Sequence, residues 1–227
     1  MIRYANDLAI KRKAKTGKIL TLAGFGIVIG SLILSVRENQ YANSLLIVAF
    51  VATIIIQIGF ALTNRWGKSP RTDELIDRAL KGLDSSYSIF HFLLGANHVI
   101  FGPSGGFILV PSHDQGEINF RDGKWWQTVR RRRKTKQKTL KNLTSEAAIE
   151  VRATERALRK VLTDGESTNL KPLLVFMHPQ AVIHATDANP QGVHYKKLKS
   201  FIRKRRKGAS VSQNKVLRIA RNLGMGT

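Results

Sequence analysis

Apolar residues are concentrated in two long runs near the N-terminus, and shorter apolar runs alternate with polar residues further along the chain. Residues 19–36 and 45–62 contain no charged side chain. Each run has about the length that a helix needs to cross the roughly 30 Å of hydrocarbon in a bilayer. A cleaved signal peptide is the alternative interpretation of the first run, but no small-residue cleavage site follows it and a second run comes soon after. The sequence therefore predicts a hairpin of two transmembrane helices.

The charges around these two runs predict an orientation in the membrane. Six basic residues precede the first run, the link at residues 37–44 has Arg37 alone, and Arg65, Lys68 and Arg71 follow the second run. Positively charged flanks stay on the cytoplasmic side of a membrane. We therefore expect a multi-pass protein of the cell membrane, with both termini and the soluble part in the cytoplasm.

Two glycines in the first run, Gly26 and Gly30, form a GxxxG step. Such a step lets a neighbouring helix backbone approach closely. It favours packing of the two spans against each other, and homodimerisation through the same face is the alternative.

From residue 72 onward the pattern is that of a soluble α/β domain. Val, Ile and Phe cluster in short runs around a glycine-rich turn at residues 102–106, which predicts a β-hairpin with another strand after it. Apolar residues at helical spacing predict helices before and after these strands. The expected elements are a helix at 72–83, strands at 87–94, at 96–110 on both sides of the turn, and at 117–120, a helix at 143–164, strands at 172–177 and 181–185, and a helix at 196–203.

The net charge of +23 directs attention to polyanions as partners. The positive excess lies mainly in three stretches, at residues 1–18, 124–141 and 196–221. Residues 124–141 contain nine basic side chains and no acidic one, which predicts a solvated, mobile link. Residues 206–227 are expected to form a largely disordered basic tail with one amphipathic turn. The chain has no cysteine, which excludes disulfides, thiol catalysis and cysteine-ligated zinc.

Two tryptophans beside the basic stretch suggest how a polyanion binds. Aromatic rings next to cations form the kind of surface on which single-stranded bases stack, although a tryptophan that covers a sheet edge is the plainer interpretation. DNA, RNA and anionic lipid headgroups are the candidate partners. The predicted polyanion-binding residues are Lys124, Trp125, Trp126, Arg130, Arg131, Arg132, Arg133, Lys134, Arg203, Lys204, Arg205, Arg206 and Lys207.

Residues 72–205 resemble the nuclease-related domain (NERD) family, a branch of the restriction-endonuclease-like superfamily. The resemblance is carried by the opening TDELIDRAL, by NHVIFGPSGGFIL with the following QGEI, and by KPLLVFMHPQAVI followed by KKLKSFIR. It implies a restriction-endonuclease-like α/β domain in the order helix, antiparallel meander, helix, strands, helix, attached here to the N-terminal transmembrane hairpin.

The family's chemistry is hydrolysis of phosphodiesters with Mg²⁺, held by an Asp before the first hairpin strand and a Glu-x-Lys at the end of the second. The resemblance places these groups on Asn97, Val110 and Ser112, and the acid of the first helix on Asp73. A valine cannot bind a metal ion, which prefers several hard oxygen ligands. We therefore expect a degenerate motif without catalytic residues, metal or cofactor. His98 lies beside a ligand position and is expected to find local partners.

Three functions follow as hypotheses. The first is a membrane-anchored, catalytically inactive nuclease-like domain that binds a polyanion or acts as a scaffold. The second is an active membrane-tethered endonuclease whose site has moved to other acids, with Asp84, Asp114 and Glu117 as candidates. The third is a small subunit of a membrane complex that has no role with nucleic acid.

Overall fold

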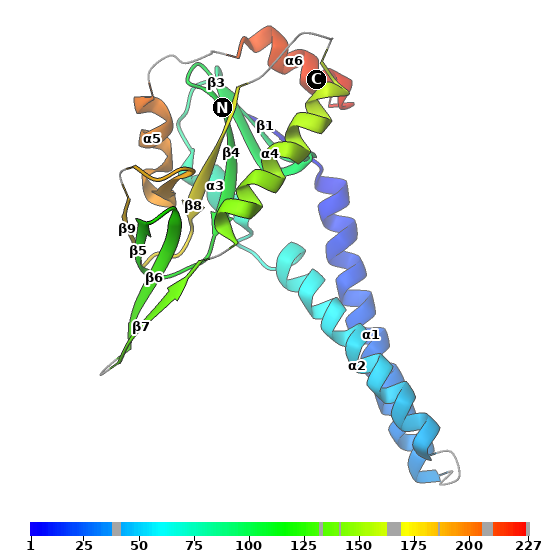
Figure 1. Cartoon of the computed structure of the whole chain (residues 1–227). Coiled ribbons are helices and arrows are strands. Elements are labelled where there is room, and N and C mark those ends of the chain that lie inside the picture. The colour runs from blue at the N-terminus through cyan, green and yellow to red at the C-terminus, as the bar shows by residue number, and fades with distance from the viewer. Residues whose placement is uncertain are drawn as a thin grey trace. The chain divides into compact units, whose positions relative to one another are not determined.

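The computed structural model of the chain describes residues 1–37, 42–131, 134–140, 142–162, 169–185, 187–205 and 211–225. It divides into two compact units. One unit is Asn6–Arg71, and the other combines Met1–Ala5 with Thr72–Thr227 (Figure 1).

The first unit consists of two long helices, α1 (Asp7–Arg37) and α2 (Ala42–Trp66), which contain the two apolar runs. Both helices are long and apolar enough to span a membrane. They contact each other through small residues, because Gly17 and Gly24 are buried on one face of α1, seven residues apart. A Cβ atom added at Gly24 would lie 2.5 Å from Cγ1 of Ile56, and one at Gly17 would lie 2.7 Å from Oγ1 of Thr63. The approach of the two backbones therefore requires glycine at these positions.

Gly26 and Gly30 do not take part in this contact. A Cβ atom added at either glycine would meet nothing within 4 Å. The prediction that this GxxxG step packs the two spans together is wrong, because the step faces away from α2. Homodimerisation through Gly26 and Gly30 stays a prediction.

The second unit is a mixed α/β domain built on a six-stranded sheet in the order β1-β2-β3-β4-β8-β10. Strands β2, β3 and β4 form an antiparallel meander, and β1, β8 and β10 join it in parallel pairings. The expected hairpin is confirmed, with its turn at Gly102 and Gly105. The strands are β1 (Ile2–Ala5), β2 (Ser88–Leu94), β3 (Ala96–Gly102), β4 (Gly105–Ser112), β8 (Leu170–Phe176) and β10 (Gln191–His194).

Helices cover both faces of this sheet. On one face, Val99, Phe101 and Ile108 pack in a core with α4 (Leu143–Arg159) and α6 (Gln213–Asn222). On the other face, Ile100 and Leu109 pack with α3 (Thr72–Ala79) and α5 (Leu198–Lys204), which follows a short 3₁₀ helix (Tyr195–Lys197). Alternate residues of a strand point to opposite faces, so burial on both faces explains why β3 and β4 are apolar along most of their length.

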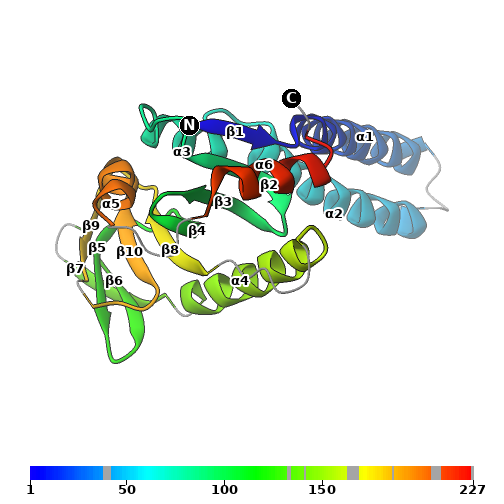
Figure 2. The ribbon, with the colours of Figure 1, turned by 90° about the horizontal axis from the view of Figure 1, so that it is seen from above.

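Strand β1 was not expected from the sequence, which placed residues 1–18 in a basic segment. It precedes the first apolar helix, yet it pairs with β2, which follows the second (Figure 2). Tyr4 stacks on Phe90 with their ring centroids 4.8 Å apart. The N-terminal residues are therefore part of the folded domain.

The C-terminal segment is also more ordered than expected. Helix α6 buries Val216, Ile219 and Ala220 in the core on the α4 side of the sheet. Ser212 begins the helix by accepting a hydrogen bond from the backbone N–H of Lys215. The amphipathic turn expected near its centre is thus a helix that belongs to the domain.

A second sheet has four strands in the order β7-β6-β5-β9. They are β5 (Gly116–Arg121), β6 (Lys124–Arg131), β7 (Lys134–Thr139) and β9 (Ala181–His184). Strands β6 and β7 form a hairpin that projects from the domain (Figure 1). The prediction of a mobile link at residues 124–141 is wrong, because a strand with one solvated face accommodates many basic side chains.

Candidate functional site

The positions that correspond to the family's metal ligands lie at one end of the β3–β4 hairpin. Val99 pairs with Ile108, and the same register continued by two residues places Asn97 opposite Val110. The Val110 side chain is 2% exposed and packs in the core on the α4 side. The position that the family fills with a carboxylate is therefore part of the apolar core.

The two polar residues of the set are engaged within the domain. Asn97 donates a hydrogen bond from Nδ2 to Oε1 of Glu150 on α4, at 2.6 Å. Ser112 donates from Oγ to Oδ2 of Asp114 at 2.8 Å, and it accepts the Asp114 backbone N–H at 3.3 Å. Both side chains thus fix the ends of strands to neighbouring segments.

Asp73 is separated from these three residues by the sheet. It belongs to α3, which packs on the face opposite to Val110. Its carboxylate is buried and lies 3.6 Å from Nη2 of Arg3 on β1. The structure therefore does not bring the four family positions together around one ion.

The α3 side of the sheet holds a chain of polar contacts that the sequence did not reveal. Arg3 donates from Nε to Oδ2 of Asp77 at 2.9 Å, and Oδ1 of Asp77 lies 3.0 Å from Nε2 of His91. Nδ1 of His91 lies 2.7 Å from Nδ1 of His98 on the neighbouring strand, and both imidazoles are buried. The prediction that His98 is satisfied by local partners is confirmed. Only the pairing of β1 with β2 brings Arg3 to this cluster, so spacing in the sequence gave no signal for it.

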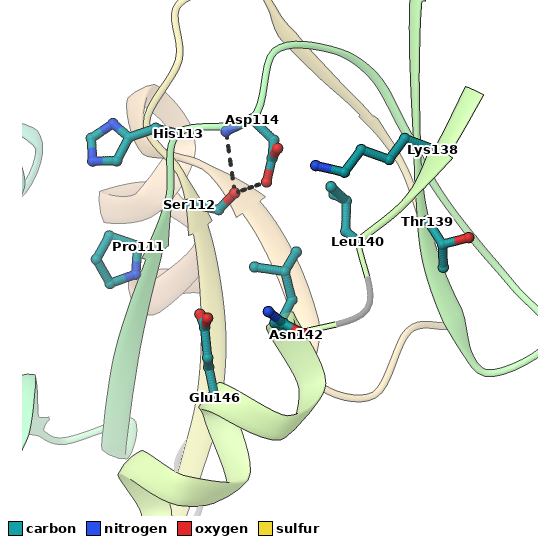
Figure 3. Close-up of a pocket in the computed structure, with 10 residues that line it drawn as sticks. Pro111, Ser112, His113, Asp114, Lys138, Thr139, Leu140, Asn142 and Glu146 are labelled. Carbon is teal, nitrogen blue, oxygen red and sulfur yellow. Dashed lines mark hydrogen bonds between the residues drawn. The ribbon is translucent and has the colours of Figure 1, made fainter. Parts of the chain in front are cut away.

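A cavity of about 610 Å³ lies where β4 ends and α4 begins (Figure 3). Strands β4 and β8 run parallel and end together here, and ligands of α/β proteins commonly bind beyond the carboxyl ends of such strands. The Asp114 carboxylate, the Lys138 ammonium and the Glu146 carboxylate point into the same space. The cavity is lined by Pro111, Ser112, His113, Asp114, Lys138, Thr139, Leu140, Asn142, Leu143 and Glu146.

The acids proposed for a displaced catalytic site do not converge. Asp114 faces this cavity, whereas Glu117 lines a different one and lies 3.7 Å from Nη2 of Arg130. Asp84 lies in an exposed turn, where hydrogen bonds from the hydroxyl and the backbone N–H of Ser86 hold its pKa below the ordinary 3.8. Among the residues that the structure describes, no three His, Asp or Glu side chains are grouped to hold a metal ion. The residues present therefore do not fit the family's metal.

The second sheet presents one polar face to solvent. Its strands align Asn119, Trp126 and Thr139 in one cross-strand row, and Glu117, Thr128 and Gln137 in the next. The Trp126 ring is half-buried in the middle of this face. The face also holds a cavity of about 530 Å³, lined by Glu117, Asn119, Arg121, Asp122, Trp126, Thr128, Arg130, Thr135 and Gln137.

Trp125 has the opposite orientation, which corrects the prediction that it binds a polyanion. Its side chain is 1% exposed, and its ring centroid lies 5.5 Å from that of Phe176 and 5.2 Å from that of Phe120. A Cβ atom added at Gly192 would lie 2.5 Å from the indole, so the glycine makes room for the ring. Trp125 therefore anchors the β6–β7 hairpin to the core.

The other basic candidates fall into separate groups. Lys124 and Arg130 are exposed on β6, whereas Arg203 and Lys204 are exposed on α5, against the six-stranded sheet. The Arg205 guanidinium lies over the Phe201 ring, 5.2 Å from its centroid. Arg131 and Lys134 belong to β6 and β7, and their side chains are not described. Arg132, Arg133, Arg206 and Lys207 lie outside the described residues.

Comparisons of this chain with protein-family models, with curated proteins and with solved structures find no match. The resemblance to the nuclease-related domain family therefore depends on the motifs in the sequence and stays a prediction.

Proposed function

We propose that this chain is a membrane-anchored polyanion-binding module, whose soluble domain is nuclease-like but lacks metal-dependent cleavage at the family's positions. The order of α3, the β2–β4 meander, α4 and β8 is compatible with a restriction-endonuclease-like domain. Val110 in the core and Asn97 bound to Glu150 support the loss of the metal site.

The basic β6–β7 hairpin is the observation that carries the proposal. Residues 124–141 hold nine basic side chains and no acid, and the strands keep their backbone extended while Trp125 anchors them. Cations on an ordered strand pair lose less conformational freedom on binding phosphates than cations on a mobile link. The hairpin is thus suited to contact a string of phosphates.

The pairing of β1 with β2 supports an even number of membrane crossings. Residues 2–5 precede α1 and residues 88–91 follow α2, yet they form one parallel ladder. This pairing favours a hairpin whose two ends lie on the same side of the membrane, and the positive flanks favour the cytoplasm. The chain has no cysteine, so Gln40→Cys and Thr227→Cys can be tested with a membrane-impermeant maleimide. We expect labelling of intact cells at position 40 only, and labelling at position 227 would contradict the proposed orientation.

Binding can be measured with the full-length protein in phosphatidylcholine nanodiscs and a fluorescent oligonucleotide. If about 6 to 10 phosphates are neutralised, the affinity falls by about 10³ to 10⁵ between 50 and 200 mM salt. Replacing Lys124, Arg130, Lys136 and Lys138 by glutamine is expected to weaken binding strongly, and glutamine at Arg203 and Lys204 is expected to weaken it less, because these two cations lie on α5 and not on the hairpin. The proposal would be contradicted by an oligonucleotide affinity that does not change with salt concentration, or by an affinity that the four glutamine substitutions in the hairpin leave unchanged.

Anionic lipid is expected to compete for the same cations, because each basic residue near an anionic surface contributes about 1 kcal/mol. Adding phosphatidylglycerol to the nanodisc is therefore expected to weaken oligonucleotide binding. A chain that binds phosphatidylglycerol but no nucleic acid would instead favour the third hypothesis, a subunit of a membrane complex.

A displaced-site endonuclease is a second candidate, and the cavity at the end of β4 is the observation that favours it. Asp114 and Glu146 face this cavity beside Lys138. We expect plasmid DNA to stay intact with Mg²⁺ or Mn²⁺. Chelator-sensitive cutting that Asp114→Asn abolishes and Glu117→Gln leaves unchanged would establish the enzyme, because Asp114 faces this cavity and Glu117 lines a different one.

A further inference from the structure

The solvent-exposed face of the second sheet, here called the open face, has an aromatic ring at its centre. Trp126 lies between Asn119 on β5 and Thr139 on β7, and Glu117, Thr128 and Gln137 in the next row are polar. Its neighbour Trp125 points into the core, as strand alternation requires. The face thus offers one indole that is held by a rigid strand and is accessible from solvent.

The charges on the open face are mixed, so electrostatic attraction alone would not make this face the preferred binding site of a polyanion. Arg121 and Arg130 are accompanied by Glu117 and Asp122 around its cavity. Lys124, opposite Arg121 in the register, adds one further positive charge. A purely electrostatic partner would bind better to the basic part of the hairpin, where residues 130–141 hold no acid. Something other than charge has to give the open face its affinity.

Stacking and hydrogen bonding can supply that affinity. Asn119, Thr128 and Gln137 surround the indole with donors and acceptors. Arg130 lies two steps along the same face of β6 from Trp126, about 13 Å away in an extended strand. Its contact with Glu117 is an exposed pair, with side chains 76% and 43% exposed, and such pairs exchange partners at little cost. Arg130 is therefore free to contact a phosphate while a base covers the indole.

We propose that the open face binds the unpaired bases of a single-stranded nucleic acid, with Trp126 as the stacking platform. This inference rests on the proposed polyanion-binding function and names its ligand class. Bases in a duplex are already stacked on each other and offer no free face to the indole, whereas unpaired bases stack on aromatic side chains. Phospholipid headgroups have no aromatic base to stack on the indole.

The test compares three probes of equal phosphate number on full-length protein in phosphatidylcholine nanodiscs: a dT oligonucleotide of about 12 nucleotides, the same strand with abasic sites, and a duplex. We expect the dT strand to bind about 5- to 150-fold more tightly than the abasic strand, which corresponds to one stacked base or more. Trp126→Ala is expected to remove this preference, and Trp126→Phe to keep most of it. Binding of the abasic strand is expected to stay unchanged in both variants.

Val182→Ala is the matched control, because Val182 is an apolar side chain on the same row as Glu117 and is 50% exposed. It is expected to leave all three affinities unchanged. Equal binding of dT and abasic strands, or a Trp126→Ala variant that keeps the preference, would overturn the inference and leave polyanion binding intact. Tighter binding of the duplex would also overturn it, in favour of a ribbon that enters the major groove. No binding of any probe would overturn the proposed function itself.

Discussion

The two sheets of the α/β domain differ in how their faces are covered. The six-stranded sheet is covered by helices on both sides, and its central strands β4 and β8 are apolar along most of their length. The four-stranded sheet packs Ile118 and Trp125 into the core on one side and leaves the open face to solvent. Only the second sheet has a face that packing does not occupy.

This difference shows where function can be placed in such a domain. The resemblance to nucleases puts the catalytic positions on the sheet whose faces are both needed for packing, and there Val110 is buried and Asn97 is bound to Glu150. On the other sheet, successive residues of a strand point alternately into the core and to solvent. Polar and aromatic residues on the solvent side can therefore bind a ligand without any loss of core packing. The sheet with a free face is therefore the one that can present binding groups without loss of core packing.

The largest expected difference in stability is between two variants that each introduce a glutamate, one into each sheet. Val110→Glu buries a carboxylate in the apolar core and is expected to destabilise the domain by about 4 kcal/mol or more. Gln137→Glu places the same group on the open face and is expected to change stability by less than about 0.5 kcal/mol. Urea denaturation of both full-length variants, followed by tryptophan fluorescence, checks the difference. Equal stability of the two variants would contradict the burial of Val110.

The adjacent tryptophans offer a comparison within one strand. Trp125→Ala is expected to cost about 3 to 5 kcal/mol, because it leaves a cavity beside Phe176 and Phe120. Trp126→Ala is expected to cost less than about 1 kcal/mol, because its ring is only half-buried. Thermal unfolding by circular dichroism measures both. A reversed order would mean that the register of β6 is shifted by one residue.

Polar side-chain contacts on the two sheets are also expected to differ, with the larger stabilisation on the six-stranded sheet. His91→Ala removes the buried imidazole that contacts Asp77 and His98, which we expect to cost about 2 to 3 kcal/mol. Glu117→Gln breaks the exposed contact with Arg130 and is expected to cost at most about 1 kcal/mol. A double-mutant cycle of His91→Ala with His98→Ala isolates the contact between the imidazoles. Additive effects would show that the two rings contribute independently.

The smallest expected effect concerns an exposed acid next to the six-stranded sheet. Hydrogen bonds from Ser86 lower the pKa of Asp84, so the folded state favours the ionised form. The resulting stabilisation is present above the ordinary pKa of 3.8 and is lost as the pH falls through the lower value of the folded state. We expect Asp84→Asn to unfold at a slightly lower temperature than the unchanged protein at pH 6 and at the same temperature near pH 2, as measured by thermal unfolding. A difference in unfolding temperature that grows as the pH is lowered would contradict the lowered pKa of Asp84.

Elements with a strong hydrophobic period were predictable from the sequence. The β3–β4 hairpin has apolar runs on both sides of a glycine-rich turn, and α4 has Ala147, Val151 and Leu158 on one side. The two apolar runs predicted α1 and α2 because each run is long enough for a helix that spans a bilayer. In each case the signal lies within a short window of the chain.

Elements that depend on distant partners were missed or misread. Strand β1 has only four residues, and its partner β2 begins at Ser88, so no local pattern marks it. Strands β6 and β7 were read as a link because their basic composition hides the alternation of Trp125 and Trp126. The site follows the same rule, since only the register shows which of these neighbouring rings reaches solvent.

The position of strand β1 in the chain also determines when the six-stranded sheet can be completed during synthesis. Residues 2–5 leave the ribosome before either apolar helix, whereas β2 is made after both. The edge of the six-stranded sheet therefore stays open until the helical hairpin has been translated, and β1 is available to close it only then. Strand β1 also brings Arg3, which contacts Asp73 and Asp77. Complete folding of the α/β domain therefore requires that residues 2–5 meet β2 after both helices have been made.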